Sequence, residues 1–331
     1  MAVKVAINGL GRIGRCVARI IADRNDVELV AVNASGSEEM IQYNLKYDTV
    51  HGSKLDVKVE NGYIYIGKDK AKLISERDPS KIDFASCGAD VVLECTGAFL
   101  SQESCQAYID NGVKKVVISA PAKDDTPTFV IGANEHTYSG QPIVSNASCT
   151  TNGLAPVARV LDEAFGIEKG LMTTIHSYTS SQPILDAKDK KDPRKGRAGA
   201  TNLTPSSTGA AKAIGLVMPH LKGKLNGQAI RVPTPNVSLV DLTVTLKKDV
   251  TKEEVITAFK TFAEGSLKGI LGIDEEYRVS SDFNGETLST VVPLDTIQVI
   301  EGNMVKVLSW YDNEWGYSTR LVEMGIHIAT K

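Results

Sequence analysis

Three glycines at a fixed spacing follow the first apolar run of the chain. Residues 3–7 (VKVAI) have the composition of a β-strand, and Gly9, Gly11 and Gly14 then form the pattern G-x-G-x-x-G. Apolar residues recur at helical spacing over 13–21. Between a strand and a helix, such glycines allow a tight turn, close approach of backbone N–H groups to a pyrophosphate and close helix packing. The pattern predicts a dinucleotide site; the alternative is a plain strand-to-helix turn.

Further strand-like runs continue this alternation through the first 148 residues. They lie at 27–32, 90–95, 115–118 and 142–144, with a helical stretch at 103–109. Strands that alternate with helices favour a parallel sheet wound on both faces. We therefore expect an α/β, Rossmann-type, NAD(P)-binding domain over residues 1–148.

The pattern changes after residue 148. A helix with Pro156 inside it is followed by longer strand-like runs at 170–176, 229–232, 237–246 and 305–311. Long strands with few helices between them favour an antiparallel sheet, so we expect an α+β catalytic domain over 149–312. The polar stretch 177–203 is too long for an ordinary connection, which indicates a functional or interface loop. Residues 313–331 are expected to form a C-terminal helix that returns to the first domain.

Composition excludes several classes of protein. The 331 residues carry a formal net charge of -3, so no basic surface is indicated for nucleic acid. The apolar runs are too short to span a membrane, and the early strand argues against a signal peptide. Five cysteines without a CxxC pair fit a reducing cytoplasm and indicate no metal site.

The second strand lacks a residue that this kind of domain commonly has. An Asp or Glu is expected at its end to bind the ribose hydroxyls, but the sequence reads Asn33-Ala34-Ser35. Without a carboxylate to repel a 2′-phosphate, NADP becomes acceptable, and Asn33 and Ser35 could donate hydrogen bonds to that phosphate. The alternative is that the acid was lost without a change of cofactor.

Cys149 and His176 are candidates for a nucleophile and its base. Cys149 lies where a strand meets a helix, and the helix dipole there would lower the pKa of the thiol below its ordinary value. His176 ends an apolar strand. From these local features alone, a structural cysteine and a core histidine stay open as alternatives.

A third cluster contains candidate anion-binding residues. Residues 206–210 (SSTGA) open a helix whose N-terminal amides could bind phosphate, and Arg231 lies within an apolar strand. A solvated turn and a structural salt bridge are the alternatives.

Taken together, these motifs closely resemble the phosphorylating glyceraldehyde-3-phosphate dehydrogenases of the bacterial-like type, over essentially the whole chain. The matching stretches are INGLGRIGR (7–15), KYDTVHG (46–52), ECTG (94–97), SNASCTTN (145–152), TTIHSYT (173–179), PSSTGAAKA (205–213), RVPTPNVS (231–238) and WYDNEWGYS (310–318).

The resemblance implies oxidative phosphorylation of D-glyceraldehyde 3-phosphate to 1,3-bisphosphoglycerate in glycolysis and gluconeogenesis, with NAD or NADP as hydride acceptor. Cys149 would form the thiohemiacetal and thioester, with His176 as acid and base. Substrate and inorganic phosphate would contact Ser148, Thr150, Thr179, Thr208, Gly209 and Arg231. The cofactor would contact Gly9, Gly11, Arg12, Ile13, Gly14, Asn33, Ala34, Ser35, Arg77, Thr96, Ser119, Lys188, Asn313 and Tyr317. The family also implies a homotetramer whose subunits meet at loop 177–203.

Several positions depart from the common family pattern. Asn33-Ala34 replaces Asn-Asp, as in NADP-using members, and Ser181 stands where many relatives have Asp. Gly153 replaces a cysteine that takes no part in the chemistry. We hypothesise that Lys188 supplies a cation to the 2′-phosphate from a neighbouring subunit. Dual or NADP-leaning specificity is therefore expected.

Two other functions remain open. Erythrose-4-phosphate dehydrogenase shares these motifs but hydrolyses the thioester, so its rate would not depend on phosphate. A nucleotide-binding module without catalysis is the second, and the intact set of Cys149, His176, Arg231 and Asn313 argues against it.

Overall fold

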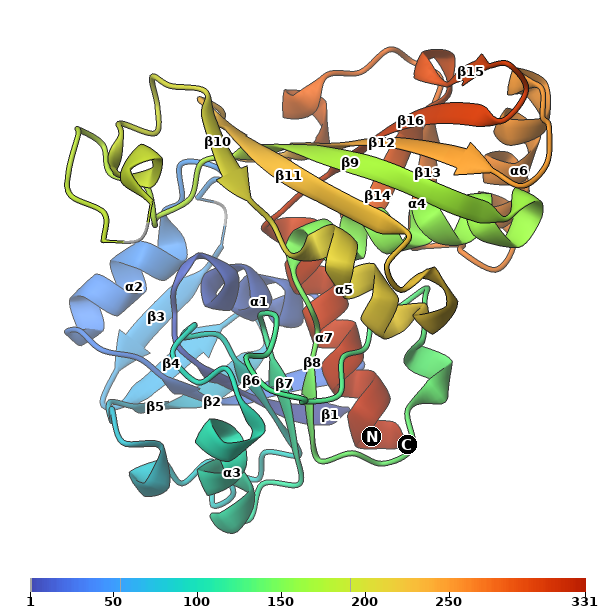
Figure 1. The fold of residues 1–331 in the computed structure, drawn as a ribbon. Coiled ribbons are helices and arrows are strands. Elements are labelled where there is room, and N and C mark those ends of the chain that lie inside the picture. The colour runs from blue at the N-terminus through green and yellow to red at the C-terminus, as the bar shows by residue number, and fades with distance from the viewer. Residues whose placement is uncertain (1, 54, 191) are drawn as a thin grey trace. The chain divides into compact units, whose positions relative to one another are not determined.

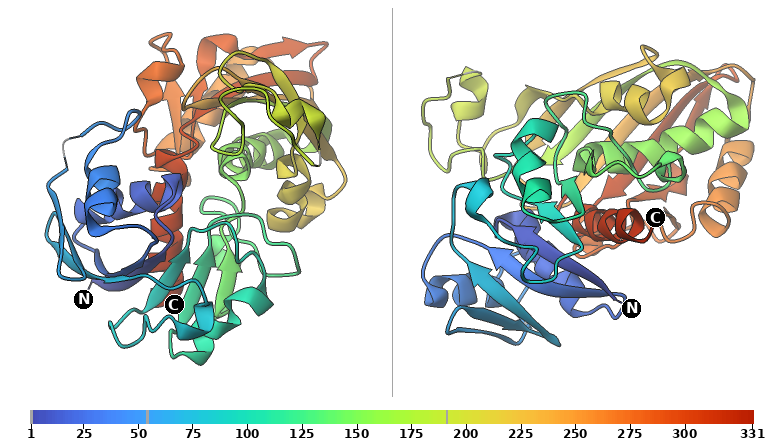
Figure 2. Two further views of the ribbon diagram at one scale, coloured as in Figure 1. Left: turned by 90° about the vertical axis from the view of Figure 1, so that its left-hand side faces the viewer. Right: turned by 90° about the horizontal axis from the view of Figure 1, so that it is seen from below.

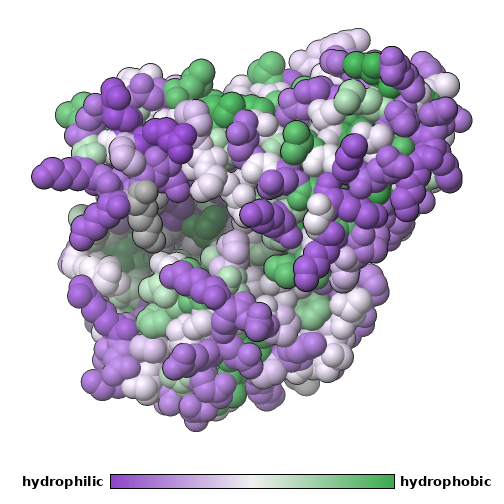
Figure 3. Space-filling model, in the orientation of Figure 1, coloured by the Kyte–Doolittle hydropathy of each residue, from purple (hydrophilic) through white to green (hydrophobic). Residues whose placement is uncertain are grey.

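The structure is a computed structural model that describes residues 2–53, 55–190 and 192–331 (Figures 1 and 2). The chain divides into two compact units. The first contains Met1–Ser148 and Ser318–Lys331, and the second contains Cys149–Tyr317. In the described part of the chain, no helix combines the length and the apolar character that a membrane crossing requires. On the face seen in Figure 3, hydrophilic side chains predominate and hydrophobic ones form small patches between them.

The described residues of the first unit form one eight-stranded sheet in the order β3-β4-β5-β2-β1-β6-β7-β8. Its strands are β1 (Val3–Asn8), β2 (Val27–Asn33), β3 (Val57–Glu60), β4 (Tyr63–Ile66), β5 (Asp69–Ile74), β6 (Val91–Glu94), β7 (Lys115–Ile118) and β8 (Ile143–Ser145). Its helices are α1 (Arg12–Ala22), α2 (Glu38–Lys46) and α3 (Gln102–Asp110), and α7 (Trp315–Thr330) starts in the second unit and continues in the first.

The sheet reverses its winding direction between β1 and β6. From β5 to β8 neighbouring strands are parallel. The chain steps from β1 to β2 in one direction and from β6 to β7 in the other. Because such crossovers are right-handed, α1 and α3 cover opposite faces, and the edge between β1 and β6 is where ligands bind in this class of fold. The doubly wound α/β fold expected from the sequence is confirmed.

An antiparallel meander, β3-β4-β5, extends this sheet and was not expected from the sequence. Asn61 and Gly62 join β3 to β4, and both have positive φ, at 54° and 74°. This is the geometry of a tight hairpin turn, for which Asn-Gly is the preferred pair. The Asn-Gly pair between alternating apolar residues was thus the signal that could have found the meander.

The second unit forms a mostly antiparallel sheet in the order β10-β11-β9-β12-β16-β14-β13, with β15 paired to β16. The strands are β9 (Ile167–Ser177), β10 (Thr204–Ser207), β11 (Leu225–Val232), β12 (Ser238–Leu246), β13 (Leu271–Asp274), β14 (Thr290–Pro293), β15 (Gln298–Ile300) and β16 (Met304–Tyr311). The helices are α4 (Cys149–Phe165), α5 (Ala210–Val217) and α6 (Lys252–Glu264). The expected α+β architecture is confirmed, with parallel pairs only at β9–β11 and β13–β14 among the described strands.

The core of the second unit lies on one face of this sheet. Along β12 every second residue is buried, as expected for a strand with one covered face. Helix α4 packs on β12 and β16, and it continues to Phe165 although Pro156 removes one backbone donor. The covered face therefore carries the helix that starts at Cys149.

Loop 178–203 is held by local contacts although it has little regular structure. The Ala187 N–H donates to Gly196 O at 2.7 Å, and a Cβ on Gly196 would lie 2.2 Å from Ala187 O. Asp186 accepts from the Ala198 N–H at 3.0 Å and pairs with Arg197 at 2.7 Å. The described parts of the loop, 178–190 and 192–203, therefore have a defined course, with a short 3₁₀ helix at Pro193–Gly196.

Candidate active site

The glycine-rich turn is shaped by backbone contacts that exclude larger side chains at two of its three glycines. Gly9 has φ +95°, and a Cβ there would lie 2.9 Å from the Thr96 side chain. A Cβ on Gly14 would lie 1.9 Å from Gly9 O. Nothing lies within 4 Å of a Cβ built on Gly11, which immediately precedes α1. The turn therefore leaves open space at the N-terminus of a helix, where the backbone can approach a pyrophosphate.

A cavity of about 510 Å³ adjoins this turn within the first unit. Seven of the predicted cofactor residues line it: Gly9, Gly11, Asn33, Ala34, Ser35, Arg77 and Thr96. Arg12, Ile13, Gly14 and Ser119 do not line it. Sequence reasoning missed its apolar wall, to which Met40, Ile41 and Phe99 contribute. Met40 is an exposed large apolar side chain at the start of α2, a signal that could have indicated this wall. The cavity has the size and the lining of a site for a nucleotide.

The side-chain amide of Asn33 has partners within the protein. Its Nδ2 donates to Asn8 Oδ1 at 2.7 Å and to the Glu76 carbonyl at 2.8 Å, and its Oδ1 accepts from the Glu76 N–H. Both amide hydrogens of Asn33 are therefore bound within the protein, and its donor role toward a phosphate stays a prediction. Asn33 instead holds the segment at Glu76 beside the end of β2.

Arg12 is likewise engaged elsewhere. Its guanidinium forms a bidentate pair with Asp48, with Nη2 to Oδ1 at 3.2 Å. Burial works to raise the pKa of Asp48, but the hydrogen bonds from Arg12 and from the Val50 and His51 N–H groups lower that pKa to about 2. The guanidinium of Arg12 is thus paired with Asp48, and a contact of Arg12 with the cofactor stays a prediction.

Two other polar side chains at the cavity remain available. Ser35 and Arg77 are exposed, and neither side chain has a partner among the described residues. The Glu76 carboxylate accepts from the backbone N–H of Arg77, not from its guanidinium. The guanidinium of Arg77 is therefore unpaired among the described residues. Ala34, at the end of the second strand, has no carboxylate. The unpaired guanidinium of Arg77 thus lines a cavity that lacks the usual carboxylate at the end of the second strand.

A buried carboxylate, which sequence reasoning did not single out, organises the end of β6. Glu94 accepts hydrogen bonds from Asn8 Nδ2 at 2.6 Å, from Tyr108 OH at 3.0 Å and from the N–H and hydroxyl of Thr96. Burial raises the pKa of Glu94, although these hydrogen bonds oppose the shift. The network positions Thr96, which lies against Gly9.

In the second unit, Cys149 and His176 are brought together. Cys149 is the first residue of α4, and Ala147 before it has a positive φ of 55°, so the chain turns sharply between β8 and the helix. His176 lies near the end of β9 and is buried. Cys149 Sγ lies 3.5 Å from His176 Nε2. A half-buried thiol beside a ring nitrogen can pass its proton to that nitrogen and act as a nucleophile.

The electrostatics of this pair differ from the sequence-based expectation. Burial raises the pKa of the Cys149 thiol, although the Arg231 charge and hydrogen bonds at the start of α4 oppose the shift. The lowered pKa predicted from the helix dipole is therefore wrong for the unliganded chain, because desolvation of the thiolate outweighs the dipole. Burial and the Arg231 charge lower the pKa of His176 to about 3, so its imidazole is neutral at pH 7.

Arg231 is the cation of this site. Its Nη1 lies 2.7 Å from His176 Nδ1 and donates to Ser177 O at 2.8 Å. No carboxylate pairs with it in the described part of the chain. A partly buried guanidinium without a counter-ion favours an anionic ligand.

The other predicted anion-site residues are Ser148, Thr150, Thr179, Thr208 and Gly209. Thr150 Oγ1 is 3.0 Å from Tyr311 OH, so it is bound within the core. Thr179 Oγ1 lies 2.8 Å from Ser181 Oγ. Thr208 accepts from the Ala210 N–H, and Gly209 caps α5 with open space around it. Ser148 is the last residue of the first unit before the helix.

The remaining predicted cofactor residues of the second unit differ in exposure. Asn313 is buried and accepts a hydrogen bond from Ser238 Oγ at 2.7 Å. Tyr317 is buried on α7, and Lys188 is exposed on loop 178–203. Gly153 lies against Tyr311, whose ring would be 3.0 Å from a Cβ at that position, so the helix approaches this ring closely.

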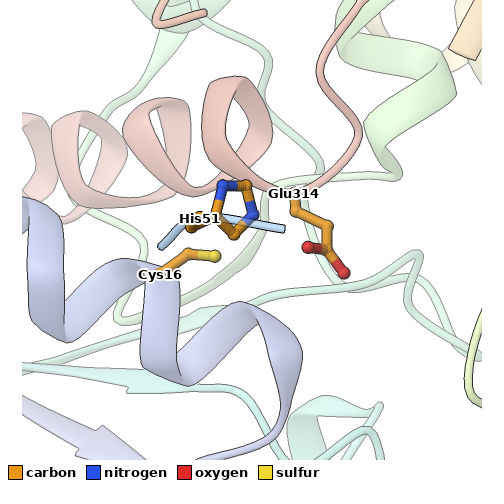
Figure 4. Close-up of side chains that lie close together, drawn as sticks. All are labelled: Cys16, His51 and Glu314. Carbon is orange, nitrogen blue, oxygen red and sulfur yellow. The ribbon is translucent and has the colours of Figure 1, made fainter. Parts of the chain in front are cut away.

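Cys16 and His51 form a second thiol–imidazole neighbourhood, inside the first unit. Figure 4 shows the two side chains close together, and their ligand atoms lie within 4.8 Å. Cys16 is buried on α1 and His51 is half-buried. Two side chains of one unit are fewer than the four ligands of a structural zinc site, and we assign no metal to them.

Two family profiles match the chain. The profile described as the glyceraldehyde 3-phosphate dehydrogenase NAD binding domain matches residues 3–102, and that of the C-terminal domain matches residues 148–313. The chain belongs to the glyceraldehyde-3-phosphate dehydrogenase family.

Curated members of this family are similar over their full length. Glyceraldehyde-3-phosphate dehydrogenase 1 of Bacillus cereus is 52% identical over 331 residues, covering 99% of each chain. Glyceraldehyde-3-phosphate dehydrogenase of Shimwellia blattae is 50% identical over 330 residues, and glyceraldehyde-3-phosphate dehydrogenase A of Escherichia coli K12 is 50% identical over 331. Both alignments cover 99% of this chain and 100% of the relative.

A matched pair of glycine variants tests the turn. Gly14→Ala should lower the free energy of unfolding by about 3 kcal/mol, because its Cβ collides with a backbone carbonyl. Gly11→Ala should change the free energy of unfolding by less than about 1 kcal/mol, because its Cβ points into open space. It should weaken dinucleotide binding, because the same space is where the pyrophosphate is expected to approach the backbone. Urea unfolding and titration with ADP-ribose measure both effects. Equal destabilisation by the two variants would contradict the geometry.

The raised thiol pKa predicts how Cys149 is alkylated. In the unliganded protein the rate with iodoacetamide should still rise above pH 8, because the thiol form predominates below that. Arg231→Met should slow the reaction at pH 8 by roughly threefold to tenfold, because the lost cation raises the pKa further. Arg194→Met, which removes an exposed cation of the same unit, is the control. Peptide mass spectrometry assigns the modified cysteine, and a rate that is flat from pH 7 upward would contradict the shift.

Proposed function

We propose that this protein oxidises and phosphorylates D-glyceraldehyde 3-phosphate to 1,3-bisphosphoglycerate, with a nicotinamide dinucleotide as hydride acceptor. The observation that supports this most is the 3.5 Å approach of Cys149 Sγ to His176 Nε2 in a chain of this family. The chain is an NAD-dependent oxidoreductase by its family, and the open turn at Gly11 fits the pyrophosphate of such a cofactor.

The residues at Cys149 can carry the first step. As the sulfur adds to the aldehyde carbon, the thiol proton passes to the neutral Nε2 of His176, and the carbonyl oxygen then takes that proton to give a thiohemiacetal. The Cys149 N–H, at the start of a helix, can donate to the oxygen while it carries charge.

The second and third steps use the same two residues. A nicotinamide dinucleotide, when bound, would supply the hydride acceptor for oxidation of the thiohemiacetal. His176 takes the hydroxyl proton at the same time, which leaves a thioester on Cys149. An oxygen of inorganic phosphate then attacks the thioester carbon, the C–S bond breaks, and the sulfur takes the proton that His176 holds, which returns both residues to their starting state. A thioester suits this transfer because it is more reactive than an oxygen ester.

Arg231 and Thr179 are proposed to bind the substrate phosphate, and Ser148, Thr150, Thr208, Gly209 and Arg231 to form the site for inorganic phosphate and its surroundings. The uncompensated charge of Arg231 supports the first assignment. The open backbone at Gly209, at the start of α5, supports the second.

We propose that the protein also accepts NADP. The support is the absence of an acid at Ala34, the exposed hydroxyl of Ser35 and the unpaired guanidinium of Arg77, all at one cavity. Lys188 is proposed to add a second cation from a neighbouring subunit. The Glu76 carboxylate also lines this cavity and opposes a 2′-phosphate, so dual use is the expected outcome rather than strict NADP specificity.

We further propose that the protein forms a homotetramer in the cytoplasm. The sheet of the second unit has an exposed apolar face, with Leu171 69% and Met304 45% exposed beside a groove of about 580 Å³. Ile184 and Leu185 are exposed on loop 178–203. Surfaces of this kind favour contact between copies of the chain. All five cysteines are free, as a reducing compartment requires.

The decisive assay follows reduced dinucleotide with glyceraldehyde 3-phosphate, with and without inorganic phosphate. We expect turnover to depend on phosphate and Cys149→Ser to lose at least about 10³-fold in kcat, because the hydroxyl forms no thioester. A rate that ignores phosphate, together with faster oxidation of erythrose 4-phosphate, would instead support the alternative dehydrogenase. No finding from the family profiles or the relatives favours that alternative.

Cofactor choice is tested by two substitutions at the cavity. Ala34→Asp should raise KM for NADP by about tenfold or more while changing KM for NAD little, because a carboxylate repels the 2′-phosphate. Arg77→Met should act on NADP in the same direction through the loss of a cation. Equal effects on both cofactors would contradict the proposed role of this region. Lys188→Ala, measured in parallel, tests the contribution from the neighbouring subunit.

A further inference from the structure

Three polar atoms meet around one ring nitrogen in the second unit. His176 Nδ1 lies 2.7 Å from Arg231 Nη1 and 2.8 Å from Ser177 O, and Arg231 Nη1 also donates to Ser177 O at 2.8 Å. The other ring nitrogen, Nε2, lies 3.5 Å from Cys149 Sγ. The buried imidazole makes no further hydrogen bond with the described residues. A neutral imidazole carries a proton on only one of these two nitrogens, so their different surroundings decide which one.

Tyr311 packs against the imidazole but does not take part in that choice. The rings of Tyr311 and His176 meet edge to face, with centroids 6.0 Å apart and planes at 80°. The tyrosine hydroxyl lies 3.0 Å from Thr150 Oγ1 and 2.7 Å from Thr174 Oγ1, and the Ser238 hydroxyl is a third partner. The tautomer is therefore decided by the atoms at Nδ1 and Nε2 alone.

The guanidinium of Arg231 decides where the imidazole proton lies, because it can donate hydrogen bonds and cannot accept them. With a proton on His176 Nδ1, that nitrogen and Arg231 Nη1 would be two donors facing each other at 2.7 Å. With Nδ1 bare, its lone pair accepts from Arg231, and the proton lies on Nε2. The second tautomer is therefore favoured while the guanidinium keeps this position.

The favoured tautomer is the wrong one for a base. An N–H at His176 Nε2 can donate to Cys149 Sγ, but it cannot accept the thiol proton or the hydroxyl proton of a thiohemiacetal. Ser177 O lies 2.8 Å from Nδ1, where it can accept from an Nδ1–H once Arg231 Nη1 no longer faces that nitrogen. The site thus contains a hydrogen-bond partner for each tautomer, and the position of one guanidinium selects between them.

An anionic ligand is the kind of group that can change this position. Arg231 has no carboxylate partner, and its Nε and Nη2 have no hydrogen-bond partner among the described residues. A phosphate oxygen is a stronger acceptor for a guanidinium than a neutral ring nitrogen is. The same anion would also neutralise the charge that, together with burial, lowers the pKa of His176. Both effects make Nε2 a better base.

We propose that Arg231 holds His176 in the Nε2–H tautomer until the phosphate of the substrate takes the guanidinium, so that the base becomes active only with a phosphorylated aldehyde. The inference rests on the proposed function, in which Arg231 binds that phosphate. In the exchange one proton passes from Nε2 to water and another from water to Nδ1, so the ring stays neutral and Nδ1–H donates to Ser177 O. The bare Nε2 can then accept the Cys149 proton.

The tautomer is measured directly by ¹⁵N NMR of the full-length protein labelled at histidine, in buffer without phosphate or sulfate. The chemical shift distinguishes a protonated ring nitrogen from a bare one, and the His176→Gln variant assigns the signals. The probe is glycerol 3-phosphate, which has no aldehyde to react with Cys149. Without the probe, Nε2 should carry the proton in about nine molecules of ten or more, and at saturation the ratio should reverse.

Two arginine variants separate the switch from a general effect of charge. Arg231→Met removes the guanidinium and should show the Nδ1–H tautomer with and without glycerol 3-phosphate. Arg194→Met removes an exposed cation of the same unit, which pairs with Asp192, and should behave as wild type. Thermal melting of each variant separates loss of fold from loss of the switch.

A single turnover without inorganic phosphate gives the kinetic test. With D-glyceraldehyde, which lacks the phosphate, the burst of reduced dinucleotide should be about threefold to tenfold faster in Arg231→Met than in wild type. The burst ends with a proton on His176 and so reports the bare Nε2, whereas alkylation of Cys149 reports the thiolate. An arginine that only binds phosphate would leave this burst unchanged, and a packing defect would slow it.

The outcomes are distinct. The switch is overturned if wild type carries the proton on Nδ1 without the probe, if glycerol 3-phosphate fails to bind or binds without moving the proton, or if Arg231→Met does not speed the glyceraldehyde burst. In each of these cases the phosphate-dependent dehydrogenase assay can still succeed. If the NMR exchange is seen but glyceraldehyde 3-phosphate is not oxidised, the switch stands and the proposed reaction does not.

Discussion

The backbone N–H and C=O groups of Ser177 are the point on which the chemistry of the second unit depends. Its carbonyl lies within hydrogen-bond distance of Arg231 and of His176 Nδ1, and its N–H leads through Ser238 to Asn313. Buried backbone N–H and C=O groups need hydrogen-bond partners, so the side chains bound to Ser177 are held in place at the end of β9. A base and a side-chain amide that come from distant parts of the sequence are thereby held relative to one strand.

Burial is the second constraint on this site, and it acts against charge. The thiol of Cys149 and the imidazole of His176 are both neutral in the unliganded protein, since desolvation raises one pKa and lowers the other. Arg231 keeps its charge and lacks a carboxylate partner among the described residues. The unpaired positive charge of Arg231 therefore lies beside the neutral thiol of Cys149 and the neutral imidazole of His176. An anionic substrate would compensate that charge on arrival, which gives the site a physical reason to prefer phosphorylated aldehydes.

Much of the architecture could be predicted from sequence because periodicity and glycine spacing act locally. Strand β7 spans the predicted 115–118, and α5 begins at Ala210, at the end of the stretch that was expected to open a helix. The meander β3-β4-β5 could not be found from periodicity, because four-residue strands are too short to show it, although the Asn61-Gly62 turn was a usable signal. Helices α2 and α6 were also not predicted.

The sequence by itself determined the identity of the reactive groups and the need for a glycine turn, since a thiol, an imidazole and residues without a Cβ are properties of single positions. Only the tertiary structure decided how those groups are engaged. The side-chain amide of Asn33 donates to Asn8 and Glu76, and the guanidinium of Arg12 is paired with Asp48. Burial raises the pKa of the Cys149 thiol. Hydrogen-bond partners and desolvation depend on which distant segments meet, and a linear pattern contains neither quantity.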